Sequence, residues 1–152
     1  MKTIKLTLLA TLSFLFISTF AVGQDAKAEG EKFLKEKSKE KGVITLESGL
    51  MYKVITEGTG KTPTLTQKTK MHYHGTSIDG KVFDSSIDRG TPLSFAPNQV
   101  IKGWTEAMQL MKEGGIWEVY VPYQLGYGAR GAGGVIKPYQ ALVFRMEMIK
   151  VL

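Results

Sequence analysis

The chain of 152 residues contains no cysteine and only two histidines. Without cysteine it cannot form disulfides, and it has no thiol that could act as nucleophile or metal ligand. His72 and His74 lie two apart, so they would share one face of a strand, which is a possible spacing for metal ligands. No third histidine or acid lies at a distance that completes such a site. The sequence therefore favours two solvent-facing histidines and predicts no metal.

Two other motifs are weak signs of catalysis or nucleotide binding. Ser85 and Ser86 have no histidine nearby in the sequence, and neither lies in a G-x-S-x-G turn. Residues 126–131 match the pattern G-x-G-x-x-G, but a dinucleotide site also needs a helix that begins within the motif. Glycine and proline continue as far as Pro138, so we expect a tight loop without a helix N-terminus that could bind a phosphate.

The first residues have the pattern of an export signal. Lys2 and Lys5 precede an apolar run over residues 6–22, which ends in small residues before Gln24. This pattern predicts a signal peptide over residues 1–23 and an exported protein, periplasmic or secreted after cleavage. The alternative is an uncleaved membrane anchor, because the run approaches the length of a membrane span. In both cases the membrane is involved only through this segment.

The chain carries a formal charge of +6, which does not indicate nucleic-acid binding. Removing residues 1–23 takes away two of the 20 basic side chains and no acid, which lowers the charge to +4. Much of the remaining excess lies over residues 27–41, where lysine and glutamate are interleaved, a pattern typical of a solvated helical face. No arginine stripe with aromatic platforms is present, so we expect no nucleic-acid partner.

Residues 24–46 form a charged segment that we interpret as a lead-in helix or linker. Phe33 and Leu34 are its only large apolar residues before Gly42, so a helix there would have little surface to bury. A role as a self-association arm is the alternative, but two apolar side chains support it poorly. We expect a monomer in which residues 47–152 form the main domain.

The rest of the sequence predicts strands and one helix. Residues 51–55, 69–74, 116–121 and 141–151 have strand character, and Asp79-Gly80 is typical of a two-residue hairpin loop. Apolar residues at helical spacing predict a helix over residues 102–111, which ends before Gly114. Residues 89–92 and 123–138 are expected to be loops. The economical arrangement is an α+β domain in which one short helix packs against a curved antiparallel sheet.

Three segments concentrate aromatic residues around a single acid. They are Gly80-Lys81-Val82-Phe83-Asp84-Ser85-Ser86, Val100-Ile101-Lys102-Gly103-Trp104 and Gly126-Tyr127-Gly128. This combination, in a chain without a nucleophile or metal cluster, indicates an apolar, water-poor pocket. Taken alone, Trp104 at helical spacing and Phe83 and Phe144 on strands favour an ordinary hydrophobic core. The position of Asp84, directly after Phe83 and ahead of a loop, is not what a core predicts.

From about residue 49 to the end, the chain resembles the FKBP-type peptidyl-prolyl cis-trans isomerases, and most of all their exported macrophage-infectivity-potentiator subgroup. The three segments above occur in the family's order and spacing. The same holds for Glu47-Ser48-Gly49-Leu50, His72-Tyr73-His74-Gly75, Gly131-Ala132-Gly133-Gly134-Val135-Ile136 and Leu142-Val143-Phe144. The resemblance implies a half-barrel sheet wrapped around one short helix, with the prolyl site between them.

The resemblance also implies which residues act. It places a tryptophan floor, aromatic walls, an acid, a loop tyrosine and a backbone N–H donor on the catalytic residues Tyr73, Phe83, Asp84, Ile101, Trp104, Tyr127 and Phe144. Side chains that contact the substrate around them would be Arg89, Leu93, Phe95, Val100 and Ile136. We expect Asp84 to bond Tyr73, with Arg89 holding the acid in position. No cofactor is implied.

The implied activity is rotation of Xaa-Pro bonds in exported, proline-containing polypeptides, which would assist their folding. Macrocyclic inhibitors of this family are plausible ligands. The sequence departs from the family's pattern at Leu93, Gln99 and Lys137. Leu93 and Lys137 leave the residue preferred before proline and the rigidity of the loop undetermined. A non-catalytic module that captures proline-bearing chains is therefore the alternative function.

Overall fold

The computed structural model describes residues 11–152, with side chains from residue 23 onward. Seven antiparallel strands form one sheet in the order β1-β2-β6-β7-β3-β4, and β5 pairs with β3. The strands are β1 (Val43–Thr45), β2 (Met51–Thr56), β3 (Thr69–Ser77), β4 (Val82–Ser85), β5 (Leu93–Phe95), β6 (Ile116–Val121) and β7 (Leu142–Val151). The helices are α1 (Thr11–Lys37), α2 (Lys102–Met108) and the short 3-10 turns η1 (Pro97–Gln99) and η2 (Tyr123–Leu125).

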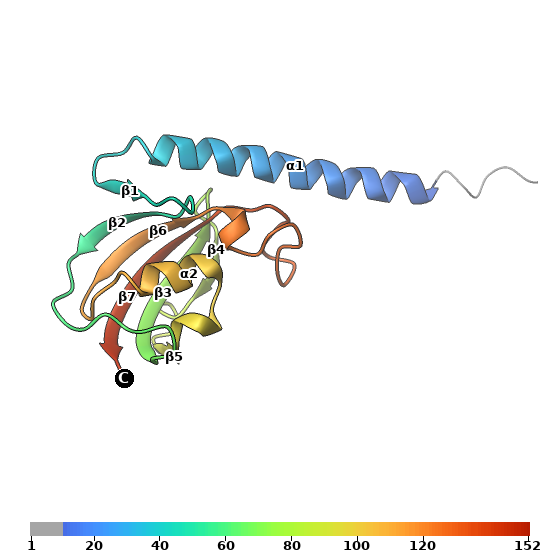
Figure 1. The fold of residues 1–152 in the computed structure, drawn as a ribbon. Coiled ribbons are helices and arrows are strands. Elements are labelled where there is room, and N and C mark those ends of the chain that lie inside the picture. The colour runs from blue at the N-terminus through green and yellow to red at the C-terminus, as the bar shows by residue number, and fades with distance from the viewer. Residues whose placement is uncertain (1–10) are drawn as a thin grey trace, which may run out of the picture.

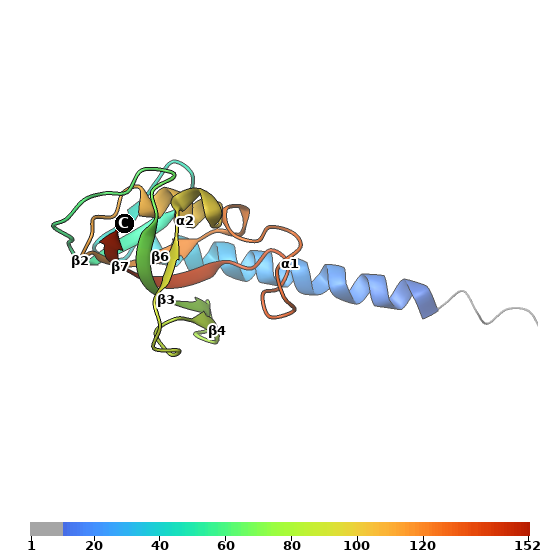
Figure 2. The same cartoon turned by 90° about the horizontal axis from the view of Figure 1, so that it is seen from below.

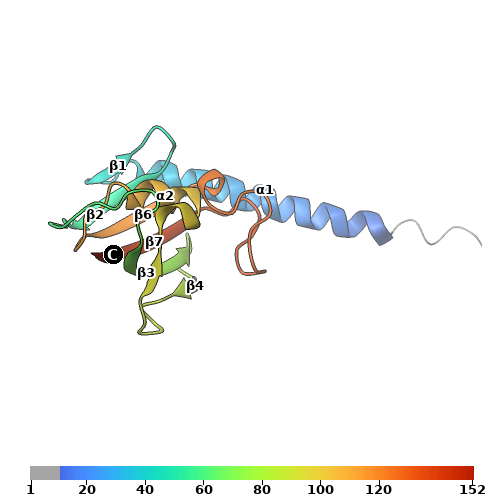
Figure 3. The ribbon, with the colours of Figure 1, turned by 60° about the horizontal axis from the view of Figure 1, so that its bottom comes forward.

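The main core lies between α2 and the concave face of the sheet, which curves around this helix (Figure 3). In β7, the alternate residues Leu142, Phe144, Met146 and Met148 are buried, as the sequence predicted. On α2 the predicted apolar stripe is also buried, but the helix ends at Met108, three residues earlier than expected. The α+β arrangement of a curved antiparallel sheet around a short helix is therefore confirmed.

Strand β3 pairs with β7 on one side and with the short edge strands β4 and β5 on the other, and it carries Tyr73 of the candidate site. Thr69, Met71 and Tyr73 are buried on one face, which confirms the predicted alternation. The hairpin to β4 is also confirmed, although its loop has three residues rather than two, since the Ser77 N–H donates to the Lys81 carbonyl. Gly80 has a φ of 84° there, a conformation that glycine adopts without steric cost.

Two short strands had not been expected from the sequence. β1 pairs with β2 through Val43↔Lys53 to Thr45↔Met51, so part of the segment interpreted as a lead-in belongs to the sheet. β5 follows the expected loop and pairs with β3. Each has only three residues, which is too short for alternation to stand out in a sequence.

Helix α1 lies along the outer, convex side of the sheet and extends past it (Figure 1). Residues 24–37, interpreted from the sequence as a lead-in helix or a linker, are helical and pack on the sheet. Leu34 is only 8% exposed and lies in a second apolar cluster with Met51, Tyr120 and Ala141. Phe33 adds an edge-on contact to the Tyr120 ring at 6.1 Å between centroids. The two apolar residues of the segment therefore attach the helix to the domain.

The same helix also contacts the base of the long loop between β6 and β7, beside which it runs (Figure 2). The Lys27 ammonium lies 5.8 Å from the centre of the Tyr123 ring. Gly30 approaches Ala141 so closely that an added Cβ would come within 3.0 Å of the alanine Cβ. Helix α1 therefore contacts both ends of this loop, at Tyr123 and at Ala141.

Part of the expected export signal, residues 1–10, lies outside the described residues, and residues 11–23 continue into α1. Among the helices of residues 11–152, none combines the length and apolar content that crossing a membrane requires.

Because Leu34 is the most buried side chain that α1 contributes to the second cluster, we expect Leu34→Ala to lower the free energy of unfolding by about 2 kcal/mol. Urea denaturation would measure this change. The neighbouring exposed Lys35 provides a control, since Lys35→Ala should change stability by less than about 0.5 kcal/mol. Equal stability of Leu34→Ala and the wild type would show that α1 is not attached to the sheet.

Candidate functional site

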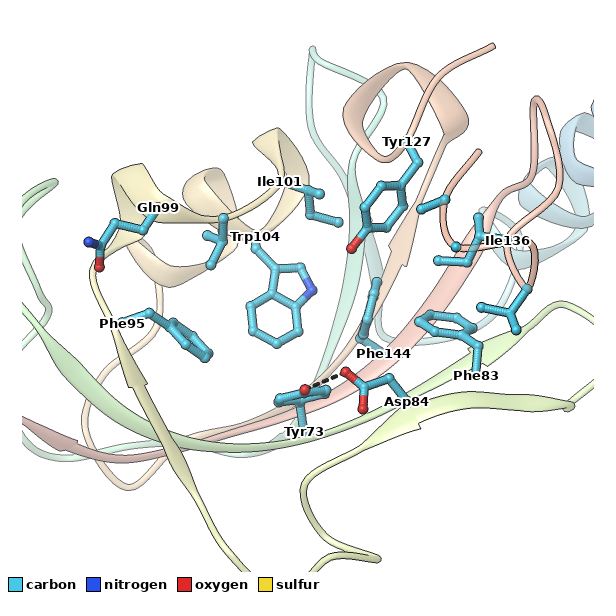
Figure 4. Close-up of a pocket in the computed structure, with 14 residues that line it drawn as sticks. Tyr73, Phe83, Asp84, Phe95, Gln99, Ile101, Trp104, Tyr127, Ile136 and Phe144 are labelled. Carbon is cyan, nitrogen blue, oxygen red and sulfur yellow. Dashed lines mark hydrogen bonds between the residues drawn. The ribbon is translucent and has the colours of Figure 1, made fainter. Parts of the chain in front are cut away.

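A cleft of about 640 Å³ opens between α2, the concave face of the sheet and the loop that follows η2. Its lining is mostly aromatic and aliphatic, and its polar groups include the Asp84 carboxylate and the hydroxyls of Tyr73 and Tyr127 (Figure 4). The lining residues are Tyr73, Phe83, Asp84, Phe95, Gln99, Val100, Ile101, Trp104, Tyr127, Ala132, Gly133, Val135, Ile136 and Phe144.

Trp104, on α2, forms the floor of the cleft and is 5% exposed. Tyr73 and Phe144 contact it edge to face, with ring centroids 5.2 and 5.1 Å away, and Phe95 lies at 5.5 Å. Edge-to-face pairs of this kind add to the free energy of burial and fix the orientation of each ring. The indole Nε1 is buried without a hydrogen-bond partner among the described residues, so the floor offers no exposed polar atom.

Phe83 and Phe144 form one wall, with their rings 5.5 Å apart and nearly perpendicular. They meet over Gly75 of β3, which pairs with Asp84 on one side and with Phe144 on the other. A Cβ at Gly75 would lie 2.8 Å from both phenylalanine rings. The glycine is therefore required at this position because it makes room for the wall.

The polar part of the site is a three-residue network at the edge of the aromatic cup. The Tyr73 hydroxyl donates to Asp84 Oδ2 at 2.5 Å, and the Arg89 guanidinium donates to Asp84 Oδ1. Arg89 also donates to the Tyr73 oxygen at 3.0 Å. The expected Tyr73–Asp84 bond and the expected position of Arg89 are thus present in the structure.

The pKa shifts of Asp84 and Tyr73 keep the acid ionised and the phenol protonated at neutral pH. Burial acts to raise the pKa of Asp84, but the hydrogen bonds from Tyr73 and Arg89 outweigh it and lower that pKa below its ordinary value. Burial raises the pKa of Tyr73, and its bond to the Asp84 carboxylate raises that pKa further. At neutral pH, Asp84 is therefore ionised and Tyr73 is a hydrogen-bond donor.

Two further hydrogen-bond donors lie on the opposite side of the cup. The Tyr127 hydroxyl points from the loop after η2 into the cleft (Figure 4), and burial followed by the nearby Asp84 charge raises its pKa. Ile101 is the N-cap residue of α2, with extended backbone, so its N–H precedes the helical hydrogen bonds. Both groups can donate to a carbonyl oxygen in the cleft.

The structure brings together nearly all the residues that the resemblance indicated. Ten of them line the cleft, and Arg89 bonds to the acid from just outside it. Leu93 is different, because it lies on β5 opposite Met71, is 40% exposed and does not line the cleft. Lys137, a departure from the family's pattern, is also outside the lining, and its N–H donates to the Gln140 side chain.

Sequence reasoning assigned no site role to four lining residues, Gln99, Ala132, Gly133 and Val135. Gln99 ends η1, and its side chain accepts the Ala96 N–H at 2.9 Å. The other three lie in a small turn that is closed by the bridge Ala132↔Ile136. A turn inside a glycine-rich loop has no periodicity in its sequence. Only Ile136, which the resemblance assigned to the site, could have indicated that this turn lines the cleft.

The motifs that the sequence analysis set aside also have structural roles. Residues 126–131 form a loop after η2, and no helix of the described chain begins within them. His72 and His74 are half-buried rather than fully solvent-facing, and their Nδ1 atoms lie 3.0 and 2.9 Å from Ser86 Oγ and Ser85 Oγ. Residues 11–152 contain no group of three side chains suited to hold a metal ion.

The curved sheet around α2, with an aromatic cleft and hydrogen-bond donors at its rim, defines an α+β half-barrel protein with an apolar ligand-binding cleft. A model of the family described as FKBP-type peptidyl-prolyl cis-trans isomerase matches residues 59–149. A second model, the domain amino terminal to FKBP-type peptidyl-prolyl isomerase, matches residues 19–54. The chain belongs to the FKBP-type peptidyl-prolyl cis-trans isomerase family.

Among curated relatives, the chain is 48% identical over 129 residues to the FKBP-type 22 kDa peptidyl-prolyl cis-trans isomerase of Escherichia coli, covering 85% of this chain and 63% of the relative. It is 47% identical over 126 residues to the macrophage infectivity potentiator of Trypanosoma cruzi, covering 82% and 64%. A third relative, 46% identical over 128 residues, is the outer membrane protein MIP of Legionella longbeachae, with 84% and 55% covered. The chain thus spans less than two thirds of the length of these relatives.

Solved structures agree with this assignment. FkpA from Escherichia coli superposes with a TM-score of 0.85 at 40% identity, covering 89% of this chain and 63% of that chain. A peptidyl-prolyl cis-trans isomerase from Pseudomonas syringae gives a TM-score of 0.79 at 36% identity, covering 84% and 94%.

Because Tyr73 donates to Asp84, we expect Tyr73→Phe to raise the pKa of the Asp84 carboxyl toward its ordinary value of 3.8. Carbon-13 NMR titration of the carboxyl would measure it. A lowered pKa stabilises the folded chain fully above the ordinary pKa, and this contribution is lost as the pH falls through the folded pKa. The lowered Asp84 pKa should therefore make the wild type more stable than Tyr73→Phe at pH 7, and this advantage should vanish in acid.

Tyr52→Phe is the matched control, since the Tyr52 ring stacks on Trp117 at 4.2 Å, away from the site. It should leave the pKa of Asp84 unchanged. An Asp84 pKa that is the same in Tyr73→Phe as in the wild type would contradict the hydrogen bond as the cause of the shift.

Proposed function

We propose that this chain is a peptidyl-prolyl cis-trans isomerase that accelerates rotation about Xaa-Pro bonds in polypeptides. The observation that carries this proposal is the aromatic cup on Trp104, which has the Tyr73–Asp84–Arg89 network on its edge. Family membership supports the same activity. The roles given below to individual residues are part of the proposal.

The chemistry requires no nucleophile or proton transfer. The barrier to rotation about a peptide bond, about 18–20 kcal/mol, arises from amide resonance, and an Xaa-Pro bond rotates uncatalysed in tens to hundreds of seconds. Resonance puts partial charge on the carbonyl oxygen and the nitrogen, and water stabilises this planar form. The twisted amide has less charge separation, so it loses less when it leaves water for a cup lined by Trp104, Phe83 and Phe144. The cup thus favours the transition state.

The polar groups complete the transition-state stabilisation. The pyrrolidine ring would lie on Trp104, where it would be close to donors from both sides of the cleft. Tyr127 and the Ile101 N–H would hold substrate carbonyl oxygens. Each 1.36 kcal/mol that such contacts remove from the barrier accelerates the reaction tenfold.

Asp84 would polarise the twisted carbonyl group electrostatically. Its carboxylate is ionised at neutral pH, and its bonds to Tyr73 and Arg89 fix its direction at the edge of the cup. A charge that is already oriented needs no reorganisation when the amide twists. We therefore assign Asp84 an electrostatic role rather than a role in acid–base catalysis.

The alternative, a module that captures proline-bearing chains without turnover, has less support. It was motivated by the charged lead-in segment and by Leu93 and Lys137, which were expected to alter the rim of the site. Neither of them lines the cleft, whereas Asp84 and Tyr127 do. A capture module has no need for an oriented carboxylate in an otherwise apolar cup.

We further propose proline-containing polypeptides as substrates and a monomer as the working state. Macrocyclic inhibitors of the family would occupy the same cleft, since an apolar cup with two carbonyl-binding donors suits a rigid ring that carries carbonyl groups. Such ligands would compete with peptide substrates.

We expect the chain to accelerate cis-trans exchange in an Ala-Leu-Pro type peptide, measured by NMR exchange or a protease-coupled assay. Asp84→Leu should lower kcat/KM at least about tenfold, the equivalent of one lost charge-assisted contact. Glu57→Gln changes an exposed carboxylate and should have no effect. A wild-type rate equal to the uncatalysed rate would defeat the proposal. Suppression of client aggregation that survives Asp84→Leu would then favour the capture module.

Export is also a proposal, supported by the charged and apolar pattern of residues 1–22 and by a relative whose name places it in the outer membrane. We expect cleavage after Gly23, so that the mature chain begins at Gln24 and keeps the part of α1 that packs on the sheet. Mass spectrometry of the protein from a bacterial periplasm would identify this N-terminus. An intact Met1 would indicate a retained anchor instead.

A further inference from the structure

Ser86, set aside above as a nucleophile, is fully buried at the end of β4, next to the polar network of the site. The ladder between β3 and β4 includes His74↔Ser85 and Gly75↔Asp84, and it stops there. Beyond it, Ser86 Oγ accepts the Tyr73 N–H at 2.7 Å, and the Ser86 N–H donates to the Tyr73 carbonyl at 3.0 Å. A serine side chain thus takes the place of a strand carbonyl opposite Tyr73.

Ser85 accepts hydrogen bonds from the backbone of the turn that carries Arg89. Its hydroxyl accepts the Asp88 N–H at 3.0 Å, and its carbonyl accepts the Arg89 N–H at 3.4 Å. The Ser86 carbonyl then accepts the Thr91 N–H at 3.2 Å, which closes the turn. The two serines therefore hold the backbone on both sides of the Asp84 carboxylate.

The two histidines of β3 complete these contacts from the outer face of the sheet. A hydroxyl has one hydrogen to donate and two lone pairs to accept with. Ser85 Oγ already accepts from Asp88, so its hydrogen is available to His74 Nδ1 at 2.9 Å. Ser86 Oγ accepts from Tyr73 and has His72 Nδ1 at 3.0 Å and the Tyr73 carbonyl at 3.2 Å as possible acceptors.

We propose that Ser86, assisted by Ser85, is a positioning residue that holds the backbone of Tyr73 and the Arg89 turn in register with Asp84. The catalytic meaning of this role rests on the proposed isomerase function. Tyr73 and Arg89 come from separate segments, and their hydrogen bonds to one carboxylate require both backbones to be fixed. The serines fix them without entering the cleft, since neither lines it.

Serine suits this position because of its size and its hydrogen-bonding capacity. Alanine at residue 86 would leave the buried Tyr73 N–H without its partner, which costs more than the net value of the bond. Threonine would bring an extra methyl group into a fully buried site, which forces neighbouring atoms to move. Small displacements of Tyr73 then lengthen its hydrogen bond to Asp84.

The test compares Ser86→Ala with the wild type in two readouts. We expect the pKa of Asp84, measured by carbon-13 NMR, to rise toward the ordinary value, and kcat/KM for the proline peptide to fall about tenfold. Ser94→Ala, an exposed serine on β5, should change neither readout. Leu34→Ala, which destabilises the chain away from the site, should leave the pKa of Asp84 unchanged, which separates positioning from a general loss of stability.

A folded Ser86→Ala protein with wild-type Asp84 pKa and wild-type kcat/KM would overturn the proposal. If Ser86→Ala does not fold, Ser85→Ala decides, because its turn lies closer to solvent; it should shift the pKa of Asp84 in the same direction, and an unchanged pKa would overturn the proposal. A wild type without isomerase activity would refute the proposed function alone, since the pKa comparison still tests the positioning role.

Discussion

The packing of Trp104 against the concave face of the sheet is the contact on which the rest of the structure depends. Through it, α2 is held inside the curve, and the rings of Tyr73, Phe95 and Phe144 are fixed around one indole. The same contact leaves a cup rather than a filled core, because a single flat ring cannot occupy the whole space between the helix and the sheet. Fold and site are therefore products of one packing arrangement.

An apolar cup of this kind would bind many hydrophobic groups. The polar network at its edge adds an oriented charge that a purely apolar cup lacks. Asp84 is charged and still stable at the edge of the cup, because a tyrosine and an arginine donate to it from different segments. The two serines behind the network hold those segments at the point where regular strand pairing ends. On the opposite face of the sheet, α1 packs against the base of the loop that carries Tyr127.

Much of this could be foreseen from residue patterns. Alternation in β3 and β7 and the helical stripe of α2 reflect local geometry, so they are visible in any stretch that is long enough. Strands of three residues, such as β1 and β5, are too short for this. Leu93 was expected at the site from the resemblance alone, but the pairing of β5 with β3 keeps it outside the cleft.

The sequence by itself determined the longer strands, helix α2, the family and most of the site's residues, because each of these depends on local periodicity or on motifs in a fixed order. Only the tertiary structure decided that α1 packs on the outer face, that Gln99 and Val135 line the cleft, and that Ser86 bonds to Tyr73. These facts depend on contacts between segments far apart in the chain, and hydrogen-bond geometry between such segments leaves no periodic trace in the order of residues.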